Sequence, residues 1–157
     1  MLEIYFTENS DIYGKLKSHL SRLLPSSFEI LRTENGKPYL EGSPLFFSIS
    51  HSDDKALIVF CDKPVGADLE VIQKRKYSSI LSRFSAEEKK EISDTEDFLS
   101  HWTVREAYIK MLGSTLNYNL DKLSYINGVL YDGNDKAECE IINGVNDGCI
   151  YCICIGK

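Results

Sequence analysis

The sequence predicts an α+β protein in which each half of the chain combines a helix with antiparallel strands. Segments of alternating apolar and polar residues recur along the 157 residues, and longer segments have the apolar spacing of helices. Tight-turn pairs separate the later strands, namely Asn127-Gly128, Asp132-Gly133 and Asn143-Gly144. We expect an N-terminal half over residues 1–73 and a C-terminal half over residues 74–157, which form one compact unit with a hinge near Gln73 to Tyr77.

The N-terminal half is expected to begin with a strand and a helix. Leu2 to Thr7 alternates as a strand does, and Ile12 to Leu24 has helical apolar spacing that Pro25 ends. Glu34 to Pro38 has the composition of a turn. Four further strands are expected, at Phe28 to Leu31, Leu45 to Ser50, Ala56 to Cys61 and Val65 to Val71. Asp53-Asp54 would then join two of these strands as a hairpin.

The C-terminal half is expected to contain two helices followed by strands. Ser85 and Glu88 have the spacing of a capping box, which starts a short helix that ends near Ile92. A longer helix is expected from about Glu96 to Leu112, with Gly113 as its stop. Four strands follow, at Lys122 to Ile126, Val129 to Tyr131, Glu138 to Ile142 and Cys149 to Ile155.

Composition excludes several classes of protein. A net charge of -6 argues against a general nucleic-acid binder, because a duplex-binding surface needs a basic footprint. No apolar run approaches the roughly 20 residues that cross a bilayer, and the first residues lack the pattern of a signal peptide. We therefore expect a soluble cytoplasmic protein without a membrane partner. The five cysteines do not form a disulfide framework or a zinc set, so we expect reduced cysteines in strands.

The helix around Trp102 is unusual because charged residues interrupt an apolar surface. Apolar residues occupy nearly every face between Phe98 and Gly113, which predicts a buried helix. Arg105 falls inside the apolar stripe, and a buried charge must be paired or bind a metal or ligand. Glu106 and Lys110 lie one turn apart and point off one side of the helix. An ordinary helix salt bridge explains this pair, but not its place on so apolar a helix.

A second feature is a pair of carboxylates on one strand. Asp68 and Glu70 are two residues apart, so both project from the same face of the strand. On its own, such a pair is most often a solvated face of an edge strand. Together with Glu106 it forms a set of three carboxylates that suits Mg²⁺, with Mn²⁺ as an alternative.

Two further segments are candidates for phosphate binding. The strand from Phe46 to Ser52 ends in serine hydroxyls and the imidazole of His51, which can all donate hydrogen bonds. The turn from Asn35 to Pro38 includes Lys37. Taken singly, the first segment is equally well a polar strand end, and the second a turn with an exposed lysine.

These segments together resemble the phosphopantetheinyl transferase superfamily, most closely its monomeric class that activates peptide and polyketide synthetases. The motifs occur in order, as Asn-Gly-Lys-Pro at 35–38, Phe-Ser-Ile-Ser-His-Ser at 47–52, Val-Gly-Ala-Asp-Leu-Glu at 65–70, Phe-Ser-x-x-Glu at 84–88 and Trp-Thr-x-Arg-Glu-Ala-x-x-Lys-x-x-Gly at 102–113. Any one motif is a weak signal, but five in order are a strong one. They cover about half of the chain.

The resemblance implies a fold and a reaction. Two similar α+β halves would be related by a pseudo-twofold axis, with coenzyme A in the cleft between them. The 4′-phosphopantetheine group of coenzyme A would pass to a serine of an acyl or peptidyl carrier protein, with release of 3′,5′-ADP. The serine proton would go to a carboxylate or to a metal-bound water. An acidic carrier would suit the basic residues Lys74, Arg75, Lys76 and Arg83.

The resemblance also implies residue roles. Asp68, Glu70 and Glu106 would bind the metal. Lys37 and His51 would bind the nucleotide phosphates, with Pro38 and Ser50 lining the pocket. Lys110 would reach the pyrophosphate and act with Glu106 in catalysis. Glu88 would lie near the reacting centre, although the capping box explains it equally well. Arg105 would contribute to coenzyme A binding where the family usually has lysine.

Two departures from the family leave alternatives open. The N-terminal part is short and lacks an obvious basic arm for the 3′-phosphate of coenzyme A, so Arg22 or Arg32 would have to supply that charge. The brevity and Arg105 also allow a binding module that holds coenzyme A or a carrier without catalysis. A third possibility is a metal-dependent phosphohydrolase, since three carboxylates can also serve a two-metal site.

Overall fold

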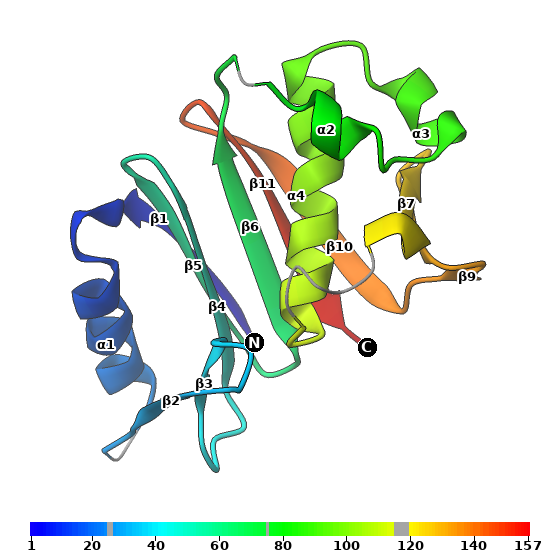
Figure 1. Cartoon of the computed structure of the whole chain (residues 1–157). Helices are drawn as coiled ribbons and strands as arrows, with labels where there is room; N and C mark the ends of the chain where they lie inside the picture. The colour runs from blue at the N-terminus through cyan, green and yellow to red at the C-terminus, as the bar shows by residue number, and fades with distance from the viewer. Residues whose placement is uncertain (25–26, 75, 115–119) are drawn as a thin grey trace.

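Two three-stranded antiparallel sheets form the centre of the protein, as seen in a computed structural model that describes residues 1–24, 27–74, 76–114 and 120–157 (Figure 1). The first sheet has the order β1-β5-β4, with bounds Leu2–Glu8, Lys55–Cys61 and Phe46–Ser52. The second has the order β10-β11-β6, with bounds Cys139–Asn146, Cys149–Gly156 and Val65–Val71. The predicted α+β class is confirmed.

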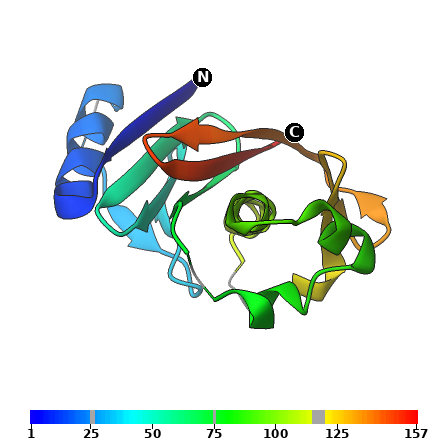
Figure 2. The same ribbon diagram turned by 90° about the horizontal axis from the view of Figure 1, so that it is seen from above.

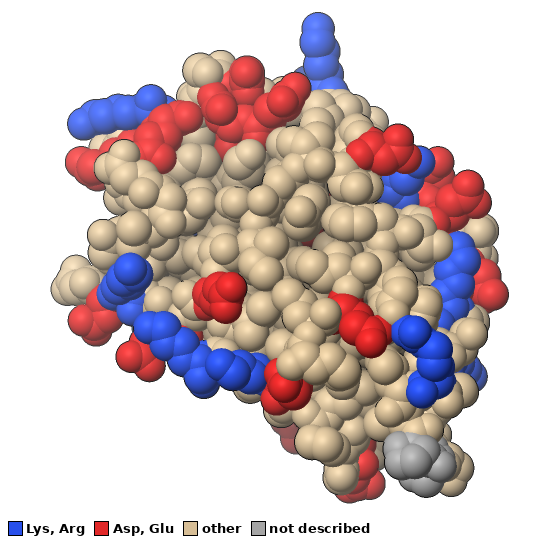
Figure 3. Space-filling model, turned by 180° about the vertical axis from the view of Figure 1, so that it is seen from behind, with Lys and Arg blue, Asp and Glu red and all other residues tan. Residues whose placement is uncertain are grey.

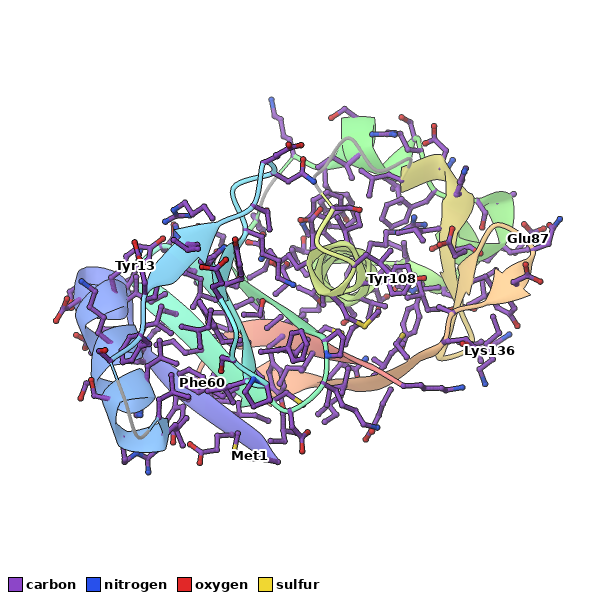
Figure 4. All side chains as sticks on the ribbon, turned by 90° about the horizontal axis from the view of Figure 1, so that it is seen from below. Met1, Tyr13, Phe60, Glu87, Tyr108 and Lys136 are labelled. Carbon is purple, nitrogen blue, oxygen red and sulfur yellow. The ribbon has the colours of Figure 1, made fainter. Side chains whose placement is uncertain are left out.

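The layers follow from the side-chain alternation of β5. Ala56, Ile58 and Phe60 of β5 pack in one cluster with Leu16 and Leu20 of α1 (Ile12–Leu23). The intervening residues of β5, Leu57, Val59 and Cys61, pack instead with residues of β6 and β11. Both faces of β5 are therefore buried, which explains why its sequence is a continuous apolar run. Figure 4 shows Phe60 on the α1 side of the first sheet.

Helix α4 (Thr95–Met111) covers the outer face of the second sheet. Its Val104, Ala107 and Tyr108 pack with Cys152 and Cys154 of β11. Figure 2 shows α4 end-on, with β10 and β11 on one side and the segment of α2, α3 and β7 on the other. This helix is apolar on nearly every face because it is enclosed on nearly every face.

The junction between the two sheets is made by serine hydroxyls. Strands β4 and β6 lie next to each other, and three serines of β4 accept hydrogen bonds from the backbone N–H groups of alternate residues of β6. The pairs are Ala67 to Ser48 at 2.9 Å, Leu69 to Ser50 at 3.2 Å and Val71 to Ser52 at 3.2 Å. Because buried backbone N–H groups need acceptors, these hydroxyls allow the edge of β6 to be buried against β4.

Shorter elements surround this centre. They are η1 (Asn9–Asp11), β2 (Ile30–Arg32), β3 (Pro38–Leu40), α2 (Ser78–Leu81), α3 (Ala86–Glu91), η2 (Leu120–Lys122), β7 (Leu123–Ile126), β8 (Val129–Asp132) and β9 (Asp135–Lys136). None of the described helices is long and apolar enough to cross a membrane. Figure 3 shows the back of the molecule, where charged residues lie mainly toward the rim of a largely uncharged face.

Most expected elements are present within a few residues of their predicted bounds. The capping box of Ser85 and Glu88 forms, and Gly113 follows α4 with a φ of 70°. Strand β3 and helix α2 were not expected, because Pro38 has turn composition and α2 has only one turn. The predicted helix stop Pro25 lies outside the described residues. All five cysteines are free, as expected, and Cys152 Sγ lies 4.0 Å from Cys154 Sγ inside the core.

Strand β6 and helix α4 approach closely at Gly66. A Cβ atom built on Gly66 would overlap the backbone carbonyl oxygen of Ala107 and the amide nitrogen of Met111. Both are backbone atoms inside a helix, so they cannot move aside as the end of a flexible side chain can. The absence of a side chain at residue 66 therefore sets the distance between the site-bearing strand and the site-bearing helix.

We expect Gly66→Ala to lower the free energy of unfolding by about 1–3 kcal/mol or more, because the methyl group pushes α4 away from β6. Urea unfolding followed by circular dichroism measures this. Gly144→Ala is the matched control, since the nearest atoms to its Cβ would belong to the side chain of Tyr151, at 3.2 Å and beyond. Equal stability of Gly66→Ala and the wild type would contradict the close approach.

Candidate functional site

A cavity of about 420 Å³ lies between the N-terminal half and the last turns of α4. Its lining includes Pro38, Ser50 and His51 from the N-terminal segments, Asp68 from β6 and Lys110 from α4. A neighbouring cavity of about 200 Å³ also borders Lys110 and is lined by the turn at 35–38, which includes Lys37. The structure thus gathers predicted site residues that are more than 70 positions apart in the chain. A cavity of this size is typical of small-molecule sites.

Lys110, Asp68 and Ser50 form a hydrogen-bonded triangle in this cavity. The Nζ of Lys110 donates to Asp68 Oδ1 at 2.7 Å and to Ser50 Oγ at 3.1 Å. Ser50 Oγ also donates to Asp68 Oδ1 at 3.0 Å while it accepts from the N–H of Leu69. Ser50 therefore holds Asp68 in place from β4.

Glu106 lies beside this triangle with an altered pKa. Burial and the negative charges of Asp68 and Glu70 raise the pKa of Glu106 to about 7, against the opposing effect of Lys110. Glu70 accepts a hydrogen bond from Ser52 Oγ at 2.9 Å. The Oε1 atom of Glu106 and the Oδ2 atom of Asp68 are buried and have no hydrogen-bond partner among the residues that the structure describes. Burying such oxygens costs free energy unless a proton or a cation binds to them.

These carboxylates fit a magnesium ion in their chemistry. Mg²⁺ prefers oxygen ligands and is commonly held by one or two carboxylates together with substrate phosphates and water. Asp68 and Glu106 each present one buried oxygen that no described residue hydrogen-bonds, which is what such a site requires. However, the described residues contain no group of three His, Cys, Asp or Glu side chains arranged around one point as metal ligands. The metal-ligand roles of Asp68, Glu70 and Glu106 stay predictions.

Lys37 contacts the end of α4 rather than projecting freely into solvent. Its Nζ donates to the carbonyl oxygens of Lys110 at 2.5 Å and of Val65 at 3.3 Å, and burial lowers its pKa. Asn35 Nδ2 donates to the carbonyl of Gly113 at 3.3 Å. A cation and an amide donor thus satisfy carbonyls at the C-terminus of the helix, where the helix dipole favours them. The sequence alone did not indicate this contact.

Arg105 lies on another side of α4, away from the triangle. Its side chain is fully buried, and its Nη2 donates to both carboxylate oxygens of Glu88 at 2.5 and 2.6 Å. Its Nη1 donates to the carbonyls of Leu120 and Leu123, and its Cζ lies 4.0 Å from the ring centre of Phe84. These contacts connect β7 and α3 to α4. The expectation that Arg105 is buried and paired is confirmed.

Glu88 receives donors from several elements. Besides Arg105, the N–H groups of Ser85 and Tyr125 donate to it, and His101 Nδ1 lies 3.7 Å away. Burial raises the pKa of Glu88, but the His101 imidazole, the Tyr125 N–H and the Arg105 charge outweigh it and lower the pKa to about 2. The structure therefore does not bring Glu88 and Arg105 together with Lys110 and Asp68. Their roles in catalysis and coenzyme A binding stay predictions.

We expect Glu88→Gln to lower the free energy of unfolding by about 3–5 kcal/mol at pH 7, because it leaves the buried Arg105 charge unpaired. The pKa of Glu88 is about 2 in the folded state and 4.5 for an unperturbed glutamate. The stabilisation that its charge gives the fold is therefore complete above pH 4.5 and is lost as pH falls toward 2. The difference between variant and wild type in urea unfolding should shrink over that interval. Glu87→Gln, at an exposed neighbouring position, is the control. A stability difference between Glu88→Gln and wild type that does not change with pH would contradict the Glu88–Arg105 ion pair.

Comparison with known proteins supports the family resemblance that the motifs indicate. The family described as "4'-phosphopantetheinyl transferase superfamily" matches residues 64–139. The chain belongs to this superfamily. The matched segment includes the site residues Asp68, Glu70, Glu88, Arg105, Glu106 and Lys110, whereas Lys37, Ser50 and His51 precede it. The resemblance found from the motifs is confirmed.

Individual phosphopantetheinyl transferases match larger parts of the chain. The 4'-phosphopantetheinyl transferase psf-1 of Bacillus pumilus is 33% identical over 68% of this chain and 49% of its own length. The transferase gsp of Aneurinibacillus migulanus is 28% identical over 75% of this chain and 56% of its own. AcpT of Escherichia coli O157:H7 is 37% identical over 64% of this chain and 55% of its own. The chain spans about half the length of the curated relatives it matches.

Proposed function

We propose that this protein transfers the 4′-phosphopantetheine group of coenzyme A to a serine of an acyl or peptidyl carrier protein and releases 3′,5′-ADP. The observation that supports this most is the Lys110, Asp68 and Ser50 triangle beside the unpartnered oxygens of Asp68 and Glu106. A cation and carboxylates at one cavity suit a diphosphate with its bound metal. The relatives named as 4'-phosphopantetheinyl transferases support the same reaction.

The arrangement of the halves is part of this proposal. Residues 1–73 and 74–157 would form two similar halves related by a pseudo-twofold axis, with coenzyme A between them. A helix and a three-stranded antiparallel sheet on each side of the cavity support it. Strand β6 comes from the chain before residue 73 but pairs with β11, so the two halves would share a strand.

Asp68 and Glu106, with Glu70 beside them, would hold Mg²⁺. When bound, Mg²⁺ neutralises negative charge on the diphosphate oxygens during transfer. The orphaned oxygens of Asp68 and Glu106 support this set. At its raised pKa of about 7, Glu106 is protonated in roughly half of the molecules at neutral pH, and it would have to be ionised to hold the cation.

The reaction exchanges one phosphorus–oxygen bond for another. The carrier serine oxygen attacks the phosphorus that bears the pantetheine arm, and the bond from that phosphorus to 3′,5′-ADP breaks. Lys110 Nζ, already oriented by Asp68 and Ser50, would bind the diphosphate and stabilise the charge on the leaving oxygen. Lys37, Pro38 and His51 would border the nucleotide. The serine proton would pass to a carboxylate of the cleft.

Glu88 and Arg105 would support the site indirectly in this proposal. Their buried ion pair connects α3 and β7 to α4, the helix that presents Glu106 and Lys110 from its other side. A direct role for Glu88 in proton transfer would require the Arg105 pair to open, since both Glu88 oxygens accept from Arg105. The contacts therefore favour a positioning role for both residues.

An acidic carrier protein would dock on basic residues near the hinge. Lys74 and Lys76 are exposed, whereas Arg83 forms an ion pair with Asp121 at 2.9 Å. Arg75, the remaining member of the predicted patch, lies outside the described residues. We also infer that the protein acts as a cytoplasmic monomer, because one chain supplies all the site residues and because its substrates would be cytoplasmic.

We expect an apo carrier protein to gain the mass of one phosphopantetheine group when it is incubated with this protein, coenzyme A and Mg²⁺. Intact-mass spectrometry on several apo carriers measures this gain. Glu106→Ala should reduce the rate at least about 100-fold, because an oxygen of the metal site is lost. Glu96→Ala, an exposed carboxylate of the same helix, should keep the wild-type rate.

Other outcomes separate the alternatives. Coenzyme A binding without a mass gain on any carrier would favour a binding module over the transferase. Release of phosphopantetheine or inorganic phosphate without a carrier would favour a phosphohydrolase. Addition of EDTA should stop the transfer, and excess Mg²⁺ should restore it.

A further inference from the structure

The last turn of α4 carries Lys110, the cation of the candidate site. The final carbonyls of a helix have no partners within the helix, so its last turn frays unless other groups bind them. A displacement of about 1 Å at a catalytic group can lower a rate by about 100-fold. The end of α4 therefore needs support from outside the helix if the Nζ atom of Lys110 is to stay in position.

The turn between β2 and β3 supplies this support. The Nζ of Lys37 donates to the carbonyl of Lys110 at 2.5 Å, and Asn35 Nδ2 donates to the carbonyl of Gly113 at 3.3 Å. Lys37 Nζ also donates to the carbonyl of Val65, at the start of β6, at 3.3 Å. Figure 1 shows β2 and β3 at the same end of the molecule as the C-terminal end of α4. These contacts of Asn35 and Lys37 form a brace for the helix end.

The turn that carries the brace is itself held firmly. The N–H of Thr33 donates to the carbonyl of Lys37 at 2.9 Å, and the N–H of Gly36 donates back to Thr33 at 2.8 Å. Thr33 Oγ1 accepts from the N–H of Lys37 at 3.1 Å. Gly36 has a φ of 79°, in the left-handed region that favours glycine. Lys37 therefore starts from a fixed backbone, which reduces the entropy lost when its side chain binds α4.

The charge of Lys37 is used on the helix end. No carboxylate of the described residues lies within ion-pair distance of Lys37. Two of the three N–H donors of its ammonium group bind backbone carbonyls, and the negative end of the α4 dipole faces it. The protein thus satisfies most of this cation before any ligand arrives, which suits a structural contact better than a ligand contact.

We propose that Lys37 is a positioning residue, which binds the carbonyl of Lys110 and so keeps the Nζ of Lys110 directed at the diphosphate. This inference rests on the proposed function, which assigns the diphosphate to Lys110. The family resemblance implies a phosphate contact for Lys37, whereas this role acts through the backbone of α4. Asn35 would contribute less, because its hydrogen bond is longer and its donor is neutral.

A double-mutant cycle between Lys37 and Lys110 tests the proposal. Lys110→Ala removes the ammonium group but keeps the carbonyl that Lys37 binds, so the brace stays while its target is lost. Lys37→Met should lower kcat for carrier modification about 10- to 100-fold in the wild-type background. In the Lys110→Ala background the same change should cost less than about twofold. Lys63→Met, at an exposed loop lysine, is the matched control and should keep the wild-type rate.

Hydrogen exchange measures the brace without any substrate. The N–H groups of Leu112 and Gly113 donate to carbonyls of the last turn, at 3.0 and 3.1 Å. Lys37→Met should speed their exchange by about 10-fold or more, because a hydrogen bond from a charged donor is lost. Lys37→Arg keeps a cation with several donors, so it should restore most of the rate and of the protection. Asn35→Ala should give a smaller change of the same kind, and circular dichroism checks that each variant is folded.

The outcomes distinguish this inference from the proposed function. Equal loss of rate from Lys37→Met in both backgrounds would overturn the inference, because Lys37 would then act on the substrate directly. Unchanged rate and unchanged exchange in Lys37→Met would overturn it as well, while leaving the transferase intact. Failure of the wild type to modify any carrier would contradict the proposed function. Faster exchange in Lys37→Met would in that case still support the brace.

Discussion

The hydroxyl of Ser50 is the contact at which the fold and the candidate site meet. It accepts the N–H of Leu69, which joins the two sheets, and it contacts both Asp68 and Lys110. The contacts that bury the edge of β6 therefore also orient the charged groups of the cavity. The next serines along β4 in either direction, Ser48 and Ser52, make the equivalent bond to β6. A change in the sheet junction would accordingly change the site, because one oxygen atom serves both.

Helix α4 is the second constraint, since consecutive residues on it serve different purposes. Arg105 points to Glu88 and is fully buried, whereas Glu106 faces Asp68 and Lys110 at the cavity. A step of about 100° per residue separates these directions. The helix is apolar elsewhere because β6 and β11 cover one side and α2, α3 and β7 another (Figure 2). Each charged residue on so enclosed a helix needs a partner, and for Glu106 we propose that this partner is a bound cation.

The sequence predicts those features that depend on local periodicity. Alternation located the strands, and the spacing of Asp68 with Glu70 and of Glu106 with Lys110 placed each pair on one face. Contacts between segments that are distant in the chain cannot be predicted from this periodicity. The bonds from Lys37 to the Lys110 carbonyl and from Arg105 to Glu88 depend on how α4 packs against other elements, which periodicity does not determine. The Ser-x-Ser-x-Ser alternation of β4 is a visible signal for the sheet junction, but serine hydroxyls in a strand equally suit the binding of a ligand.

The most direct test of this account is a crystal structure of the protein with coenzyme A and Mn²⁺, whose anomalous scattering locates the metal. We expect one metal peak coordinated by Asp68 Oδ2, Glu106 Oε1 and the diphosphate of coenzyme A, with Lys110 Nζ on the same diphosphate. A coenzyme A molecule bound outside the cavity between β4 and α4, or a metal that contacts neither carboxylate, would contradict the account.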